Sequence, residues 1–205
     1  MTDKAHMILD KALPNIPYDG WSIDVLKHAA RASGLDEACA EIAFPNGVED
    51  AVKLFLARVD AKMEALYKAR EPDLKGVGGK IKGALLCLLE AMDEHREVVR
   101  KTVQYLSNPL HATFSLSVSY QTVDKIWHMI GDKTSDFNFY TKRITLAGVY
   151  NTTLLYWLQD DSENYHETEA FLDRRLKNVM QIGKFRKSVE DKLNGCLSLF
   201  KSNKA

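Results

Sequence analysis

The sequence has no excess of charge of either sign, because 28 Lys and Arg residues balance 28 Asp and Glu residues in a chain of 205. A neutral chain has no overall field that would attract nucleic acid or an anionic membrane, so any such binding must come from local patches. Cysteine is also scarce, and Cys39, Cys87 and Cys196 lie far apart without a CxxC motif. Isolated thiols of this kind are typical of a reducing compartment.

Long hydrophobic runs and targeting signals are missing as well. Each apolar run falls short of the roughly 20 residues that a helix needs to cross a bilayer. The first stretch, MTDKAHMILDKAL, carries two aspartates and no arginine, unlike a secretory signal or a mitochondrial transit peptide. We therefore expect neither a membrane span nor a cleaved leader.

Motifs of catalysis and metal binding are scarce. The sequence has no HExxH, no GxSxG, no phosphate loop and no Cys/His cluster with metal-ligand spacing. A bundle di-iron site requires paired ExxH units, and only Glu163 and His166 have that spacing. Period-two alternation bounded by turns, which would indicate strands, is not found either. We expect an all-α protein with no catalytic residue, no metal and no cofactor.

The chain does contain a succession of helical patterns, beginning with a short apolar helix before position 14. Ser22 then stands in an N-cap position, and Trp21 and Leu26 flank it with the spacing of a hydrophobic staple. This second helix is expected to end near Gly34. A further short helix is predicted from position 36 to about 43.

Three later segments carry signals for helix starts. Asn46 is predicted to cap a long helix, with Glu49 in the capping-box position. The glycine-rich segment EPDLKGVGGKIKG is consistent with a flexible connection or with a frayed helix start. Further along, Asn164 is predicted to cap a helix, with Glu167 in the box position.

The stretch from Gly131 to Asp161 is the most apolar in the chain, and positions 144–159 carry no charged side chain. Aromatic and branched residues fall on all sides of a helix drawn here, so we expect a central helix that is covered all round. Near its start, the adjacent Phe139 and Tyr140 point about 100° apart on a helix. One of the two therefore faces solvent or a partner, or else makes a second packing contact.

The segment 184–205 differs from the rest, with six basic side chains and two acidic ones. Its apolar residues recur every three or four positions, which predicts an amphipathic helix with a basic surround. Such a helix can lie in a membrane interface, fold back onto the bundle or pack on a second subunit. The pattern alone does not choose among these three.

Several long segments in the second half resemble a known family, the accessory protein of ubiquinone (coenzyme Q) biosynthesis that is ninth in its pathway's named set. These segments are GDKTSDFNFYTKR and VYNTT, within Trp127 to Asp161, and FLDRRLKNVM, from Phe171 to Met180. The likeness is strong there and faint but collinear upstream. It implies a TetR-like all-helical homodimer, in agreement with a helix-turn-helix over 22–43 and a long connecting helix.

The resemblance also implies a division of the chain and a function. Residues 1–47 would form a helix-turn-helix-like subdomain, 48–183 a lipid-binding and dimerisation bundle, and 184–205 an amphipathic basic tail. The function implied is that of a non-enzymatic helper, which binds an isoprenoid quinone or other lipid and docks on the di-iron hydroxylase of the pathway. Its place would be the cytoplasmic, inner face of a bacterial membrane, or the matrix side of the mitochondrial membrane in a eukaryote.

Particular residues follow from this resemblance. The family's aromatic pair that contacts the hydroxylase falls on Phe139 and Tyr140, beside Asp136, and Phe139 replaces a tryptophan that is common there. The tail matches the family's membrane-touching terminal helix in position and character. The predicted lipid-binding residues, from the most apolar helices and their neighbours, are Leu85, Leu89, Phe114, Leu116, Val123, Ile126, Trp127, Ile144, Ala147, Leu154 and Leu155. The predicted membrane-binding residues are Phe185, Arg186, Lys187, Val189, Lys192, Leu193, Leu197 and Phe200.

Nucleic acid is not an expected partner, despite the helix-turn-helix. Between Ser22 and Lys53 the sequence has three basic residues and six acidic ones, and DNA phosphates repel a surface with a net charge of −3. The second helix of the motif, which would enter the major groove, carries three acids and no Lys or Arg. A ligand-responsive repressor is accordingly the second hypothesis, and an enzyme is the third.

Overall fold

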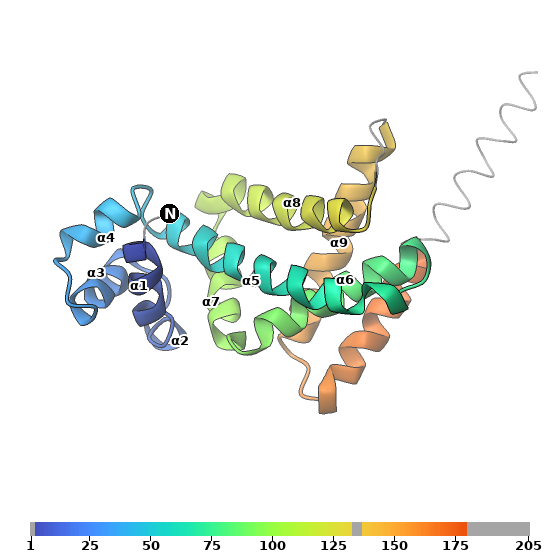
Figure 1. The fold of residues 1–205 in the computed structure, drawn as a ribbon, viewed down its shortest axis with the longest axis horizontal. Helices are drawn as coiled ribbons and strands as arrows, with labels where there is room; N and C mark the ends of the chain where they lie inside the picture. The colour runs from blue at the N-terminus through green and yellow to red at the C-terminus, as the bar shows by residue number, and fades with distance from the viewer. Residues whose placement is uncertain (1–2, 133–136, 180–205) are drawn as a thin grey trace, which may run out of the picture.

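The computed structural model describes residues 3–132 and 137–179, and every regular element within these ranges is helical (Figure 1). The predicted all-α class is therefore confirmed. An N-terminal head lies at one end of the molecule, and a larger helical bundle forms the rest (Figure 1). None of the helices in the two described ranges combines the length and the hydropathy needed to cross a bilayer.

The head consists of α1 (Asp3–Ala12), α2 (Ile16–Asp19), α3 (Ile23–Ala32) and α4 (Ala38–Ala43). Ser22 caps α3 as predicted, since its Oγ accepts a hydrogen bond from the Val25 amide at 3.2 Å. Leu26 is fully buried one turn later. Helices α3 and α4 form the predicted helix-turn-helix.

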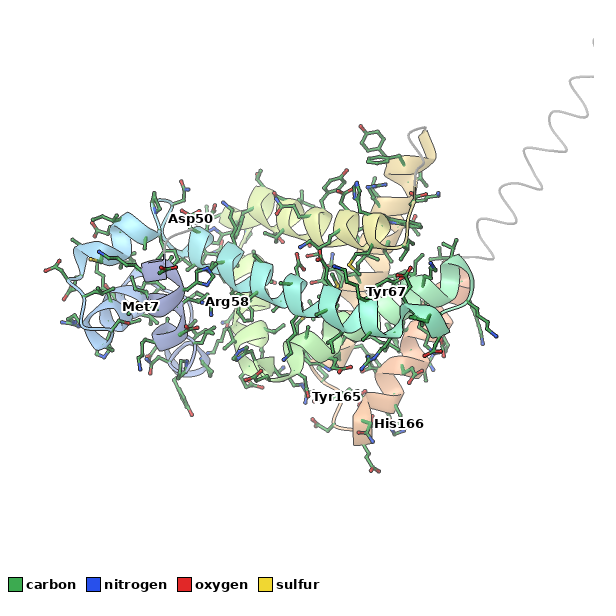
Figure 2. The ribbon with its side chains drawn as sticks, in the orientation of Figure 1. Met7, Asp50, Arg58, Tyr67, Tyr165 and His166 are labelled. Atoms are coloured by element: carbon green, nitrogen blue, oxygen red, sulfur yellow. The ribbon has the colours of Figure 1, made fainter. Side chains whose placement is uncertain are left out.

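Helix α5 (Val48–Arg70) runs from the head into the bundle (Figure 1). Figure 2 shows Arg58 of α5 reaching toward α1, where its guanidinium donates to the His6 carbonyl at 3.0 Å and pairs with Asp10. These contacts hold the head against the long helix.

The predicted capping box at the start of α5 is wrong. Gly47 occupies the N-cap position with a φ of 62°, a conformation that glycine tolerates better than other residues. The turn through Gly47 brings Asp50 back instead of Glu49. The Asp50 carboxylate accepts a hydrogen bond from the Asn46 backbone amide at 2.8 Å and another from the Asn46 side chain.

The glycine-rich segment is the start of a helix, the second of the two predicted alternatives. The 3-10 helix η1 (Glu71–Asp73) leads into α6 (Gly76–Asp93). Leu74 folds over Gly83 so closely that a Cβ at position 83 would lie 2.5 Å from Leu74 Cδ1. The absence of a side chain at position 83 therefore lets the connection pack directly on α6.

The bundle is completed by α7 (Arg96–Leu106), η2 (Pro109–His111), α8 (Ala112–Met129) and α9 (Phe137–Trp157). A 3-10 helix, η3 (Glu163–Tyr165), follows, and residues 166–179 are helical again. Residues 133–136 and the whole tail at 184–205 lie outside the described residues, so the domain boundaries stay a prediction.

The cap of the helix over 166–179 is not Asn164, which lies within η3 at a φ of 53°. Asp160 takes this role, because its carboxylate accepts hydrogen bonds from the Thr168 amide at 2.7 Å and the Ser162 amide at 2.8 Å. Although burial alone would raise its pKa, hydrogen bonds from Ser162 and Thr168 lower the pKa of Asp160 to about 2. The residue is 4% exposed and joins the end of α9 to the next helix.

Two arginines of α7 hold the C-terminal end of α9. Arg96 donates to the carbonyls of Trp157 at 2.8 Å and Asp160 at 2.6 Å, and Arg100 donates to the Leu158 carbonyl at 2.6 Å. These carbonyls are the acceptors that a helix end leaves without partners, and positive charge is favourable there. Side chains of α7 thereby hold the C-terminal end of α9.

Candidate ligand cavity and the α8/α9 face

A cavity of about 210 Å³ lies within the bundle, bordered chiefly by α5, α7, α8 and α9. Its interior is mostly apolar, with Phe55, Val99 and Leu154 among the buried side chains, and Thr102, Thr122 and Tyr150 contribute buried polar groups. The complete lining consists of Phe55, Leu56, Met92, Val99, Thr102, Val103, Leu106, Ser107, Ser115, Val118, Ser119, Thr122, Tyr150, Asn151, Leu154 and Leu155.

The exposed rim of this cavity is more polar than its interior. Ser107 and Asn151 are exposed members of the lining, and Ser119 is half-buried. The Ser119 hydroxyl donates to Asn151 Oδ1 at 3.4 Å, so the rim residues of α8 and α9 are in contact. A ligand with an apolar tail and a polar end matches this distribution.

Tyr150 brings a buried phenol to the cavity wall, with 6% of its surface exposed. Burial, and secondarily the negative charge of Asp60, raises the pKa of Tyr150, so its hydroxyl stays protonated. The pKa of Asp60 is itself raised by burial, and the Lys125 ammonium, 3.3 Å away, opposes that rise. Tyr150 can therefore serve as a neutral hydrogen-bond donor, and acid–base chemistry at neutral pH is not favoured.

The structure brings few of the predicted lipid-binding residues to the cavity. Leu154 and Leu155 line it, whereas Phe114 packs in a small separate cluster with Val52 and Val118. Ala147 is half-buried. The core holds Leu85, Leu89, Val123, Ile126 and Trp127. The exposed surface holds Leu116 and Ile144.

Several cavity residues were not predicted from the sequence, including Phe55, Val99 and the serines of α8. A usable signal was present in that helix, where Ser115, Ser119 and Thr122 follow one another at helical spacing. A stripe of small polar residues that faces the inside of a helical bundle indicates a surface that is not packed as solid core.

Within one copy of the chain, the described residues leave one side of the central helix α9 uncovered, so the prediction that it is covered all round stays a prediction. Ile144 is 72% exposed and Leu155 is 48% exposed, with Gly148 and Asn151 between them on the same side of the helix. Positions 144, 148, 151 and 155 are separated by four, three and four residues, which aligns them in one stripe. The opposite side, including Trp157, is buried as predicted.

Helix α8 continues this exposed apolar surface. Leu116 is 74% exposed and Tyr120 is 41% exposed, and both flank Ser119, which contacts Asn151 of α9. We call this surface the α8/α9 face. It consists of Leu116, Tyr120, Ile144, Gly148, Asn151 and Leu155.

The aromatic pair at the start of α9 is divided between packing and solvent. The Phe139 ring lies 3.3 Å from the guanidinium carbon of Arg143, while Tyr140 is 63% exposed. Arg143 is 2% exposed, and its Nε donates to Asp124 Oδ1 at 2.5 Å. Asp136, the third predicted partner-binding residue, lies outside the described residues, as do the predicted membrane-binding residues.

The basic side chains of α3 are paired with acids of the helix-turn-helix. Lys27 Nζ lies 2.7 Å from Glu41 of α4, and an Arg31 nitrogen lies 3.0 Å from Glu37 just before α4. The Glu41 carboxylate, by hydrogen bonding and charge, raises the pKa of Lys27. The lysine and the arginine of α3 are therefore both paired with acids within the head.

The helix order, the helix-turn-helix and the internal cavity define a TetR-like helical protein. A crystal structure of a TetR transcriptional regulator from Nitrosomonas europaea ATCC 19718 aligns with a TM-score of 0.67. The alignment covers 86% of this chain and 97% of that chain at 18% sequence identity, so it shows the fold alone. The predicted TetR-like architecture is confirmed.

Residues 112–183 match the sequence model of the family described as COQ9, and this segment contains all the motifs quoted for the predicted resemblance. The chain is 30% identical over 192 residues to the mitochondrial ubiquinone biosynthesis protein COQ9 of Rattus norvegicus, covering 90% of this chain and 61% of that protein. The Homo sapiens protein of that name is 30% identical over 191 residues, with 90% and 60% covered. The Drosophila melanogaster protein is 30% identical over 185 residues, with 85% and 55% covered.

The resemblance to the COQ9 family is thereby confirmed. The alignment with the rat relative leaves about two fifths of that protein without a counterpart, since 61% of its length is covered.

Proposed function

We propose that this protein is a non-enzymatic accessory protein of ubiquinone biosynthesis, which binds an isoprenoid quinone intermediate and presents it to the pathway's di-iron hydroxylase at a membrane. The similarity to proteins named for ubiquinone biosynthesis supports the pathway. The observation that carries the binding role is the cavity, with an apolar interior and a polar rim. Its buried phenol, Tyr150, is suited to hydrogen bonding and not to catalysis at neutral pH.

The distribution of polar groups favours one orientation of such a ligand. The isoprenoid tail enters between Phe55, Val99 and Leu154, and the quinone ring stays at the rim near Ser119 and Asn151. Each methylene group removed from water contributes about 0.8 kcal/mol, so even two isoprene units gain substantially from burial. The cavity of about 210 Å³ is smaller than the roughly 300–1,000 Å³ of typical ligand pockets. A longer tail therefore requires the helices to move apart.

Filling the cavity tests this proposal directly. Val103 lines the cavity from α7, whereas its neighbour Gln104 is exposed and does not. A ubiquinone with two isoprene units is titrated into wild type, Val103→Trp and Gln104→Trp, and affinity is measured by calorimetry. We expect Val103→Trp to bind at least about tenfold more weakly, a loss of about 1.4 kcal/mol, and Gln104→Trp to bind normally.

Thermal melting shows whether both variants fold. Equal affinity in two folded variants would place the ligand elsewhere, and absence of binding to wild type would reject a quinone as the ligand. Organic extraction of the purified protein followed by mass spectrometry identifies the lipid that it carries.

The contact with the hydroxylase is proposed for the start of α9. Tyr140 is exposed beside a Phe139 that contacts Arg143, and an exposed aromatic is a frequent centre of binding energy in interfaces. The basic, amphipathic sequence at 184–205 supports a second contact, with an anionic membrane surface. The place proposed for the protein is thus peripheral, on the inner face of a bacterial membrane or the matrix side of a mitochondrial one.

A ligand-responsive transcriptional regulator is the second candidate, because the head has the helix-turn-helix of a TetR-like fold. The neutralised Lys27 and Arg31 and the acidic α4 disfavour binding to DNA phosphates. A gel-shift assay with genomic fragments at low salt tests this candidate. A stable complex that dissociates on addition of the quinone would support it over the accessory role.

A homodimer formed through the α8/α9 face is also proposed. The exposed residues of α9 from 139 onward, and those of α8 up to 121, are uncharged in a chain where 27% of residues are charged. In a twofold interface a residue near the axis meets its own copy, so a charge there would face a like charge. Ile144 and Leu155 on either side of Gly148 supply apolar contacts, and the glycine allows a second helix to approach closely.

A further inference from the structure

We propose that the second copy of the chain closes the cavity, so that quinone occupancy and dimerisation stabilise each other. This inference rests on the proposed quinone-binding function. The observation that carries it is that Asn151 and Leu155 belong both to the cavity lining and to the α8/α9 face. The surface that a second copy covers is therefore also the rim through which a ligand enters.

The dimensions of α9 support closure. Ile144 and Leu155 are eleven residues apart, which corresponds to about 16 Å along a helix. A stable interface buries about 800 Å² per partner, which is roughly 28 Å across. An interface of this size centred on Gly148 extends past Leu155, and it also covers Asn151.

The interface with the second copy also covers the α8 side of the rim. The Ser119 hydroxyl contacts Asn151 at 3.4 Å, and Leu116 and Tyr120 beside it are exposed apolar members of the α8/α9 face. A partner helix that packs on these two side chains lies across the gap between α8 and α9. Access of water to the quinone ring from this side of the rim then requires the two copies to separate.

A thermodynamic coupling follows from this geometry. If each cavity of the dimer holds the quinone more tightly than the monomer by some factor, each bound quinone strengthens the dimer by the same factor, and two bound quinones strengthen it by the square of that factor. The dimer is then the carrying form, and delivery of the quinone requires the interface to open. We expect a factor of about ten, within the usual range for coupled sites.

The test compares two isoleucines of similar exposure. Ile144→Glu places a charge on the α8/α9 face, 72% exposed in wild type, without touching the cavity lining. Ile42→Glu places the same charge on α4 of the head, at a residue that is 77% exposed. Sedimentation velocity measures the dimer over a range of protein concentrations. Stopped-flow transfer of two-isoprene ubiquinone to phosphatidylcholine vesicles measures its release.

We expect Ile144→Glu to be monomeric where wild type and Ile42→Glu are dimeric. Because differences in affinity appear mostly in the dissociation rate, the variant should also release the quinone about tenfold faster. Release from wild type should accelerate as dilution dissociates the dimer, and saturating quinone should strengthen the wild-type dimer about a hundredfold, which is about tenfold for each of its two cavities. If Ile144→Glu does not fold, Leu116→Glu makes the same test from α8.

Two results overturn the inference. One is a dimer that persists in the folded Ile144→Glu and Leu116→Glu variants, and the other is a monomer that releases the quinone at the wild-type rate. If wild type binds the quinone and only the coupling is absent, the proposed function survives. If wild type dimerises but binds no quinone, the proposed function fails and the coupling fails with it.

Discussion

The guanidinium of Arg143 lies 3.3 Å from the ring centroid of Phe139, one turn earlier on α9. The same arginine is 2% exposed and donates to Asp124 of α8 at 2.5 Å. A cation fixed by a carboxylate on one side fixes the aromatic ring on the other. This contact holds Phe139 in place while its neighbour Tyr140 stays exposed.

Replacing Arg143 should destabilise the bundle strongly, because it leaves the partly buried Asp124 and the Asp132 carboxylate without this cation. We expect Arg143→Met to lower the free energy of unfolding in urea by about 3–5 kcal/mol. Arg31→Met, which removes an exposed pair with Glu37, should cost less than about 1 kcal/mol. Equal losses in the two variants would contradict a structural role for the buried arginine.

Tyr140→Lys should abolish co-purification of the hydroxylase with little change in stability. The side chain is 63% exposed, and a surface substitution of this kind usually changes the free energy of unfolding by less than about 0.5 kcal/mol. Tyr18→Lys in the head, at an 83% exposed tyrosine, is the control and should leave co-purification intact. Retention of the hydroxylase by Tyr140→Lys would reject this interface.

Asp160 should make the stability of the protein depend on pH in the acid range. Its pKa of about 2 when folded lies below the roughly 3.9 of an unfolded aspartate, so its contribution is full above pH 4. That contribution, about 2 kcal/mol, is lost as the pH falls through 2. The stability difference between wild type and Asp160→Asn, measured by urea unfolding, should therefore shrink from pH 5 to pH 2. A difference that is constant over this range would exclude the proposed role of the ionised carboxylate.

Two glycines of α6 should respond oppositely to alanine. A Cβ at Gly79 meets no atom within 4 Å, so Gly79→Ala should stabilise the protein by about 0.5–1 kcal/mol through helix propensity. Gly83→Ala should destabilise it by about 1 kcal/mol, because the new methyl group displaces Leu74. Thermal denaturation measures both effects. Adding Leu74→Ala should turn Gly83→Ala into a stabilising change, and failure of this rescue would show that Leu74 is not the obstacle.

Local signals in the sequence predicted many of the helices but not all of their boundaries. The Ser22 cap was correct because serine, the staple residues and the apolar stripe all favour the same helix start. At α5 the prediction was wrong, since the positive φ of Gly47 brings Asp50 and not Glu49 to Asn46. At the helix over 166–179, Asp160 is distant in sequence from the amide it caps, beyond the reach of a capping-box pattern.

The cavity was harder to locate from the sequence because an apolar residue looks the same in a packed core and in a cavity wall. Leu85 and Leu154 have equal hydropathy and both pack in the core, yet only Leu154 also lines the cavity. The difference depends on how α7 and α8 are placed, which periodicity does not encode. The exposure of Ile144 was not predicted, for a similar reason. An apolar stripe predicts that a surface is buried, but it does not tell whether the same chain or a partner buries it.

The clamp of Arg96 and Arg100 on the end of α9 limits how the protein admits a long tail. Because α7 is tied to α9 there, and Arg143 ties α9 to the C-terminal half of α8, these connections resist separation. The N-terminal half of α8, from Phe114 to Ser119, is held by a small apolar cluster. We expect a longer guest to displace this half of α8, which carries neither of these arginine contacts, so the length of tail that the cavity accepts depends on how far this segment moves.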